Sequence, residues 1–197
     1  MATSIVDIES MLPATLTVPG MGEREFLELC EKFPDATLEY EADGTVLIMP
    51  PTDPESSARL VTITSELKNW SRRMRKGIVT GSDGGFFLRD GSRRSPDAAW
   101  FDDKRWRAAK VPGTRFPSFA PDFVIELRSP GDRVAPLARK MRQYKDNGVQ
   151  LGWLIDPQNR TVTIYRPDSE PVVLTNPNEV IGDGPVQGFV LPLKEIF

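Results

Sequence analysis

The sequence predicts an α/β or α+β fold with a mixed β-sheet flanked by helices. Residues 54–76 have the clearest helical pattern, and residues 123–127 read as an apolar strand. A helical pattern over 135–147 separates that strand from another apolar strand at 152–156. A helix that connects two buried strands in this way predicts that the strands run parallel. A β-hairpin pattern over residues 38–49 adds antiparallel pairing.

The N-terminal part of the chain predicts a helix followed by this hairpin. Residues 22–33 carry apolar side chains at helical spacing, and Pro34 ends the helix. The strands at 38–40 and 46–49 flank an Asp-Gly pair, which is typical of a tight hairpin turn.

The remaining elements follow from the same periodicities. Residues 54–76 place an apolar residue at every third or fourth position, and basic residues gather in the last turns, where they complement the helix dipole. Further strands are expected at 78–80, 85–89, 97–101, 161–166 and 190–191, and a short helix at 102–110.

The 197 residues suit one domain. We expect an N-terminal arm over residues 1–21 and a single domain over 22–197. The sequence contains no secretory signal and no apolar run long enough to span a membrane, so we expect a cytoplasmic protein without a membrane partner. The single cysteine, Cys30, cannot form an intrachain disulfide, and its place on an apolar helix face favours packing.

Histidine is absent from the chain. This excludes Ser-His-Asp and Cys-His catalysis, zinc sites with histidine ligands and histidine-based nucleases. The charge distribution is also uneven. Residues 1–58 carry two basic and twelve acidic residues, whereas residues 59–145 carry twenty basic and nine acidic residues. The basic centre is typical of a polyanion-binding surface, and solvated helix faces are the alternative.

Two acids lie at the ends of predicted strands. Glu126 ends an apolar run, where a buried charge needs a cation or metal to compensate it. Asp97 begins the strand pattern at 97–101. Together with the Leu127 carbonyl they could hold Mg²⁺ or Mn²⁺, which would bind a scissile phosphate and acidify a water. The alternative is that both acids pair with nearby arginines.

Lys140 lies on or beside the inward face of the 135–147 helix. That face is defined by Leu137, Met141 and Tyr144. An inward lysine could reach Glu126 and then position the attacking water or stabilise the transition state. A structural ion pair between the two residues is the alternative.

These motifs together resemble the Uma-type family of bacterial restriction-endonuclease-like domains. The resemblance rests on Ser95-Pro-Asp-Ala-Ala, Pro121-Asp-Phe-Val-Ile-Glu-Leu-Arg-Ser-Pro, Lys140-Met-Arg-Gln-Tyr and Gly148-Val-Gln-Leu-Gly-Trp-Leu-Ile-Asp-Pro. It implies a PD-(D/E)XK nuclease core, with Asp97 and Glu126 matching the metal-binding acids. Lys140 matches a catalytic lysine that this family carries on the following helix.

The chain departs from the family pattern at two positions. Arg128 replaces the lysine of the E-x-K motif and would act only as an electrostatic clamp. Ser56 follows Pro54-Glu55 where the family usually has a histidine. Glu55 matches an additional acid of such nucleases, although an acid at a helix N-terminus also interacts favourably with the helix dipole.

The resulting prediction is a Mg²⁺- or Mn²⁺-dependent endonuclease acting on DNA, with a homodimer expected for double-strand cleavage. The alternatives are a non-catalytic nucleic-acid-binding protein on a nuclease-like fold and an interaction or assembly protein. The candidate phosphate-contacting residues are Arg72, Arg73, Arg75, Lys76, Arg93, Arg94 and Arg128.

Overall fold

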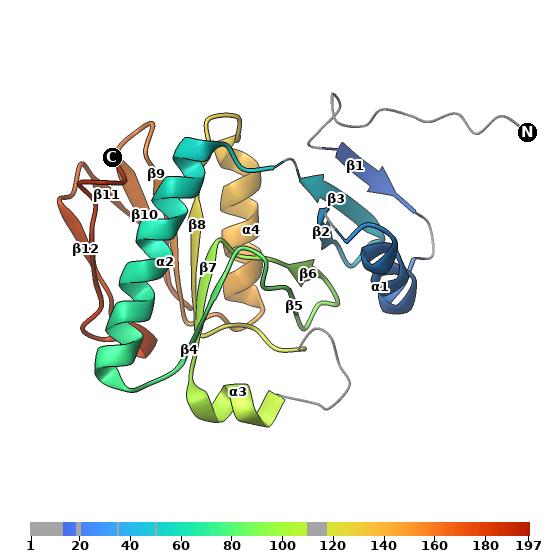
Figure 1. The fold of residues 1–197 in the computed structure, drawn as a ribbon, viewed down its shortest axis with the longest axis horizontal. Coiled ribbons are helices and arrows are strands. Elements are labelled where there is room, and N and C mark those ends of the chain that lie inside the picture. Colours follow the sequence, from blue (N-terminus) through green and yellow to red (C-terminus); the bar gives the residue numbers. More distant parts are fainter. Residues whose placement is uncertain (1–13, 19–20, 35, 50, 110–117) are drawn as a thin grey trace, which may run out of the picture.

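The structure is a computed structural model that describes residues 14–18, 21–34, 36–49, 51–109 and 118–197. At its centre is a six-stranded sheet of order β11-β10-β9-β8-β7-β4 (Figure 1). Only β8 and β9 are parallel, and each of the other neighbouring pairs is antiparallel. The strands are β4 (Ile78–Gly81), β7 (Ala98–Phe101), β8 (Phe123–Leu127), β9 (Leu151–Asp156), β10 (Thr161–Tyr165) and β11 (Val172–Thr175).

Two long helices cover opposite faces of this sheet (Figure 1). Helix α2 (Pro54–Met74) buries Ile63, Leu67 and Trp70 against one face. Helix α4 (Val134–Asp146) buries Met141 and Tyr144 against the other. Alternate strand residues point to each face, which explains the wholly apolar character of β8 before Glu126. The mixed sheet with flanking helices confirms the predicted fold class.

Helix α4 connects the two parallel strands and packs closely on β9. A Cβ atom added at Gly152 would lie only 2.6 Å from the Cε of Met141. The absence of a side chain at this position lets the helix approach the sheet. The inward residues of α4 are therefore held against β9, the neighbour of strand β8, which carries Glu126.

The start of α2 is fixed by an N-terminal cap. The side chain of Asp53 accepts hydrogen bonds from the amides of Glu55 and Ser56, and Pro54 occupies the first turn. The helix ends at Arg75, whose φ of 49° is in the left-handed region. Figure 1 shows that α2 runs along the sheet, so its two ends lie at opposite edges of the molecule.

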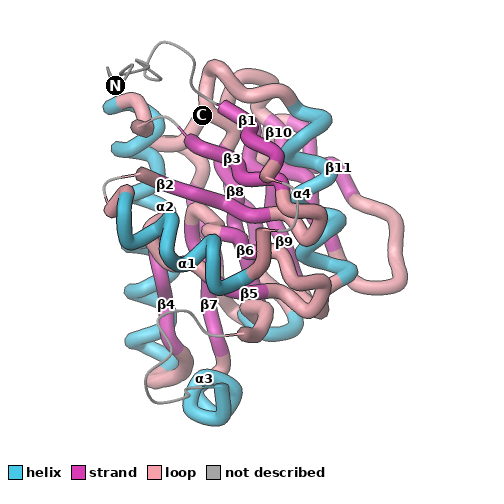
Figure 2. Tube along the Cα trace, turned by 90° about the vertical axis from the view of Figure 1, so that its right-hand side faces the viewer, coloured by secondary structure: helices cyan, strands magenta, loops and turns pink. Residues whose placement is uncertain are grey.

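A second, smaller sheet carries the N-terminal part of the chain, with strand order β1-β3-β2-β6-β5 (Figure 2). Phe26 and Cys30 of the adjoining helix pack in its core, as expected for a buried cysteine. Its elements are β1 (Ala14–Thr17), β2 (Thr37–Tyr40), β3 (Thr45–Met49), β5 (Phe86–Phe87), β6 (Arg93–Arg94) and α1 (Glu23–Lys32).

The predicted arm over residues 1–21 is partly wrong. Residues 14–17 form β1, which pairs antiparallel with β3. Residues 1–13, 19 and 20 lie outside the described residues. Pairing of this kind depends on a distant partner strand, so the local sequence carries little signal for it.

The C-terminal segment closes the α2 face of the main sheet. Phe189 and Leu191 join the core that α2 covers. The ring of Phe189 stacks on that of Trp153, with 5.5 Å between the ring centroids. The remaining elements are α3 (Asp103–Ala109), β12 (Glu179–Ile181), the 3₁₀ turn η2 (Gly184–Val186) and β13 (Val190–Pro192).

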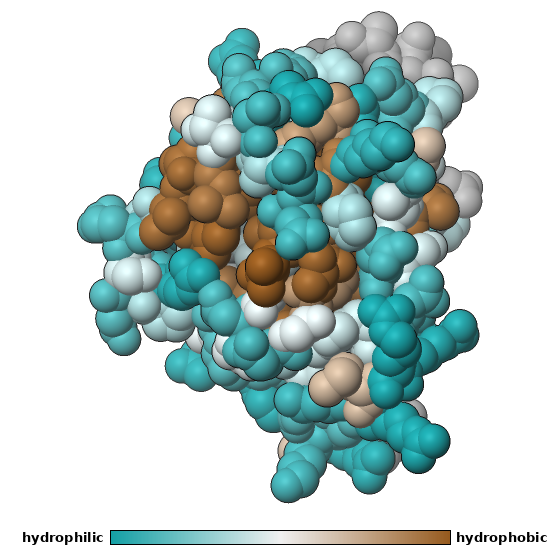
Figure 3. All heavy atoms as spheres, turned by 90° about the vertical axis from the view of Figure 1, so that its left-hand side faces the viewer, coloured by the Kyte–Doolittle hydropathy of each residue, from teal (hydrophilic) through white to brown (hydrophobic). Residues whose placement is uncertain are grey.

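Apolar side chains gather on one outer face of the molecule (Figure 3). Val172 and Val173 on β11 are exposed, as are Ile181 and Val190, which lie opposite each other on β12 and β13. The homodimer stays a prediction. None of the described helices is long and apolar enough to cross a membrane.

Candidate functional site

Asp97 and Glu126 lie side by side at the same end of the neighbouring strands β7 and β8. The β7–β8 register pairs Ala98 with Ile125, and its continuation by one residue places Asp97 opposite Glu126. Opposite residues on antiparallel neighbours direct their side chains to the same face. The amide of Leu127 donates a hydrogen bond to Oδ2 of Asp97 at 2.7 Å, which holds that carboxylate beside the strand end.

Helix α4 places the ammonium group of Lys140 beside this pair of acids. The Nζ of Lys140 lies 2.9 Å from Oε1 and 3.0 Å from Oε2 of Glu126. One helical turn later, the hydroxyl of Tyr144 donates to Oε1 of Glu126 at 2.9 Å. The structure therefore brings Asp97, Glu126, Leu127 and Lys140 together in one cluster, while their catalytic and metal-binding roles stay predictions.

Glu39 is a member of the cluster that the sequence did not reveal. Its Oε1 lies 2.9 Å from the Nζ of Lys140 and accepts a hydrogen bond from the Ser95 amide at 3.0 Å. Arg94 donates to its other oxygen at 3.3 Å. Only 5% of Glu39 is exposed. An acid in a hairpin strand ordinarily faces solvent, and no local pattern distinguishes this one.

Burial and mutual repulsion raise the pKa values of the two central acids. Burial is the larger cause and raises the pKa of Glu126 to about 8, with Asp97 and Glu39 adding to the effect and Lys140 opposing it. Burial likewise raises the pKa of Asp97 to about 6, again opposed by Lys140. Both carboxyls therefore bind protons more tightly than exposed acids do.

The other two members of the cluster keep their charges. Burial disfavours the charged form of Glu39, but Lys140 and Arg94 outweigh it and lower its pKa. Burial also disfavours the charged form of Lys140, and the surrounding acids Glu126, Glu39 and Asp97 outweigh it and raise its pKa. Lys140 is consequently a permanent cation near neutral pH.

The cluster carries fewer cations than acids. Asp97, Glu126 and Glu39 face one lysine, and Arg94 is shared between Glu39 and Glu41. A divalent cation beside Asp97 and Glu126 would compensate this excess, and hard carboxylate oxygens suit Mg²⁺ or Mn²⁺. Among the residues that the structure describes, no group of three or more acidic, histidine or cysteine side chains is arranged to hold a metal. The remaining ligands would be the Leu127 carbonyl, water and substrate oxygens.

Glu55 lies outside this cluster. It is exposed at the start of α2 and forms an ion pair with Arg59 at 2.7 Å. Its neighbour Ser56 is buried, and the hydroxyl of Ser129 donates to that of Ser56 at 3.1 Å. The N-terminus of α2 therefore lies next to the loop that follows β8. Arg128, the residue after β8, donates to Oδ2 of Asp156 at 2.8 Å.

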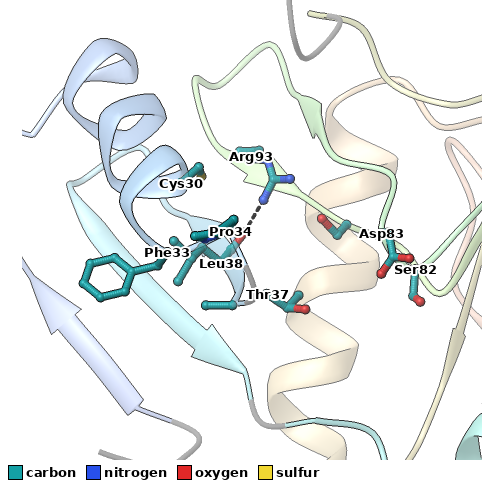
Figure 4. A pocket seen from close by; sticks show the side chains of 10 residues that line it. Cys30, Phe33, Pro34, Thr37, Leu38, Ser82, Asp83 and Arg93 are labelled. Atoms are coloured by element: carbon teal, nitrogen blue, oxygen red, sulfur yellow. Dashed lines mark hydrogen bonds between the residues drawn. The ribbon is translucent and has the colours of Figure 1, made fainter.

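The prediction that Arg93 and Arg94 contact phosphate does not fit their burial. Only 6% of Arg93 and 3% of Arg94 is exposed. Arg93 donates to the carbonyl of Leu38 and borders a cavity of about 210 Å³ near Cys30 (Figure 4). Arg94 forms ion pairs with Glu39 and Glu41. Both guanidinium groups thus find their partners on or next to β2, within the second sheet, as a buried charge requires.

The predicted basic cluster at the end of α2 is exposed but distant from these acids. Met74 lies eighteen positions beyond Ser56, which is about 27 Å along a helix. The structure does not bring these side chains to the acidic cluster, and their contact with nucleic acid stays a prediction. They are Arg72, Arg73, Arg75 and Lys76.

Comparison with known proteins decides the family. The profile of the Uma2 family, described as "Putative restriction endonuclease", matches residues 24–194. The chain belongs to the Uma2 family. This confirms the resemblance drawn from the sequence motifs.

A solved structure of similar fold supports the same conclusion. It is described as a putative nuclease belonging to DUF820 from Anabaena variabilis ATCC 29413. The two chains share 25% identity and a TM-score of 0.71, over 84% of this chain and 90% of the other. No curated protein matches the sequence. The Uma2 family and the fold both support a nuclease function.

Proposed function

We propose that this Uma2 protein is a metal-dependent endonuclease that hydrolyses phosphodiester bonds in DNA. The observation that carries the proposal is the placement of Asp97 opposite Glu126, with both pKa values raised beside a single lysine. Strongly perturbed acids next to a specific charged partner are characteristic of functional sites.

Asp97 and Glu126 would hold Mg²⁺ or Mn²⁺, with the Leu127 carbonyl as a further ligand. When bound, the ion would polarise the scissile phosphate and lower the pKa of a coordinated water. Hydrolysis then forms a bond from the water oxygen to phosphorus and breaks the bond from phosphorus to the leaving deoxyribose oxygen, and a proton lost by the water is balanced by one taken up by the leaving oxygen. Asp97 is suited to its role because the Leu127 amide fixes its orientation.

Lys140 would act as a donor and a positive charge. Its raised pKa keeps it protonated near neutral pH, so it does not serve as a general base. Glu39 would hold the Lys140 ammonium in place when Glu126 turns to the metal, because it lies 2.9 Å from the same nitrogen. From that position the lysine can stabilise the negative charge that develops on the phosphate.

A nicking assay tests this proposal. Supercoiled plasmid is incubated with the protein in Mg²⁺, in Mn²⁺ and in EDTA, and conversion to open-circular DNA is measured. We expect metal-dependent nicking by the wild type and by Asp168→Asn, a control at an exposed turn. Asp97→Asn should lower the rate at least 100-fold. Equal nicking by wild type and Asp97→Asn, or none by either, would contradict the catalytic assignment.

The second candidate is a DNA-binding protein that does not cut. One observation favours it: Arg128 replaces the lysine of the family motif and is engaged with Asp156. Metal-independent DNA binding by a protein that shows no nicking in either metal would select this candidate.

A further inference from the structure

A cavity with two arginines lies near the acidic cluster of Asp97 and Glu126, at the N-terminal end of α2. Here a cavity of about 200 Å³ lies between the first turns of the helix and the loops that follow β8 and β9. It contains two guanidinium groups, from Arg59 and Arg128. The cavity is lined by Glu55, Arg59, Arg128, Pro130, Pro157 and Gln158.

Both arginines are held in fixed positions by other parts of the fold. The Nε of Arg59 donates to the carbonyl of Ile196 at 2.8 Å. Arg128 donates through Nη1 to Asp156 and through Nε to the carbonyl of Asp132. These contacts leave Nη1 of Arg59 and Nη2 of Arg128 with no hydrogen-bond partner among the described residues. Two pre-oriented guanidinium groups with free N–H donors suit a phosphate.

The remaining charged residue of the cavity is Glu55, whose side chain is held only weakly there. Its carboxylate accepts a hydrogen bond from the Nη2 of Arg59 at 2.7 Å, but 71% of its side chain is exposed. An ion pair with so exposed a carboxylate contributes little to stability, so an arriving phosphate could displace Glu55 at little cost.

We propose that this cavity binds a phosphate of the nucleic-acid backbone, adjacent to the phosphate that is cut. The inference rests on the proposed function, since it takes Asp97 and Glu126 as the cutting centre. Arg128 lies two residues beyond Glu126, which is about 7 Å along an extended chain. A backbone phosphate in the cavity and one at the acidic cluster can therefore belong to neighbouring parts of the same strand. Glu55 acts here as a competitor of the substrate.

Equilibrium binding in EDTA tests the subsite without cleavage. A fluorescein-labelled 20-base-pair duplex is titrated by anisotropy at several salt concentrations. We expect Arg59→Gln and Arg128→Gln each to weaken binding about 5- to 20-fold and to lower the salt slope by about one. Glu55→Gln should tighten binding about two- to fivefold, because it removes the competing charge.

Two controls match these charge changes away from the cavity. Arg24→Gln removes an exposed arginine that also pairs with a glutamate, and Glu170→Gln removes an exposed acid. Both should bind the duplex nearly as the wild type does. Tighter binding by Glu55→Gln cannot arise from misfolding, which keeps the test decisive if Arg128→Gln is unstable.

The inference is overturned if Arg59→Gln and Arg128→Gln bind no worse than Arg24→Gln, or if Glu55→Gln binds more weakly than wild type. It is also overturned if the wild type binds no duplex at low salt. The proposed function is judged separately, from metal-dependent nicking and its loss in Asp97→Asn. A wild type that nicks while the cavity variants bind normally would therefore reject only the phosphate subsite.

Discussion

The Nζ of Lys140 lies 2.9 Å from Oε1 of Glu126, although one residue is on a helix and the other is the next-to-last residue of a strand. Only 3% of Glu126 is exposed, so its charge depends on this contact. The same nitrogen also contacts Glu39, and Asp97 lies beside Glu126. One half-buried lysine thus balances several acids, which leaves the cluster short of positive charge. The proposed metal would supply that charge.

Replacing Lys140 by methionine should destabilise the metal-free protein at pH 8. Removal of one partner leaves buried acids uncompensated, and such losses cost about 3–5 kcal/mol. Chemical denaturation in EDTA measures the change. Arg139→Met, an exposed position on the same helix, should change stability by less than about 0.5 kcal/mol. A Lys140→Met protein as stable as this control would show that the lysine does not balance the acids.

The stability of the metal-free protein should depend on the protonation of Asp97. Its pKa is raised from 3.8 to about 6, so the folded state binds this proton more tightly than the unfolded state. The resulting stabilisation is full below about pH 4 and is lost as pH rises through 6. The side chain of Asn in Asp97→Asn cannot ionise, so this variant does not lose stability as pH rises through 6. Melting curves in EDTA should show its melting temperature rising relative to wild type by about 3 °C or more between pH 4 and 7. A constant difference would argue against a raised pKa.

Metal affinity should rise with pH up to about 8. Carboxylates bind metal only after they lose their protons, and the pKa of Glu126 is raised to about 8. Isothermal titration with Mn²⁺ should therefore show an apparent affinity that increases up to about tenfold per pH unit between 6 and 8. The protein should release protons on binding, which titrations in buffers of different ionisation enthalpy detect. A pH-independent affinity without proton release would contradict this account.

Glu39→Gln should weaken metal binding, although Glu39 is not a proposed ligand of the metal. Lys140 then depends on Glu126 alone, so the metal must compete harder for that carboxylate. We expect the apparent Mn²⁺ affinity to fall about 5- to 10-fold, a cost of about 1–1.4 kcal/mol. Glu41→Gln is the matched control, because Glu41 pairs with Arg94 but has no contact with Lys140. Equal effects of the two variants would assign Glu39 a purely structural role.

The local pattern of the sequence was sufficient for part of the cluster. Helical spacing placed Lys140 near the inward face of α4, and the apolar run 123–127 identified the strand that carries Glu126. The parallel arrangement of β8 and β9 also followed from the helix between them. Each of these features depends on neighbours close in the chain, where periodicity is informative.

Features that depend on distant partners were not predictable in this way. Glu39 reaches Lys140 only because β2 joins β6 through the pair Tyr40 and Arg93. Arg93 and Arg94 looked like surface charges, yet this pairing buries them. Strand β11 was missed because its residues are mostly exposed and lack alternation.

Crystals grown with Mn²⁺ test the central claim most directly. Anomalous difference density locates the ion without reference to activity. We expect one peak within about 2.0–2.4 Å of carboxylate oxygens of both Asp97 and Glu126, with Lys140 retained on Glu39. A structure at pH 8 with no anomalous peak there, and with Lys140 still on both oxygens of Glu126, would contradict the proposed metal centre.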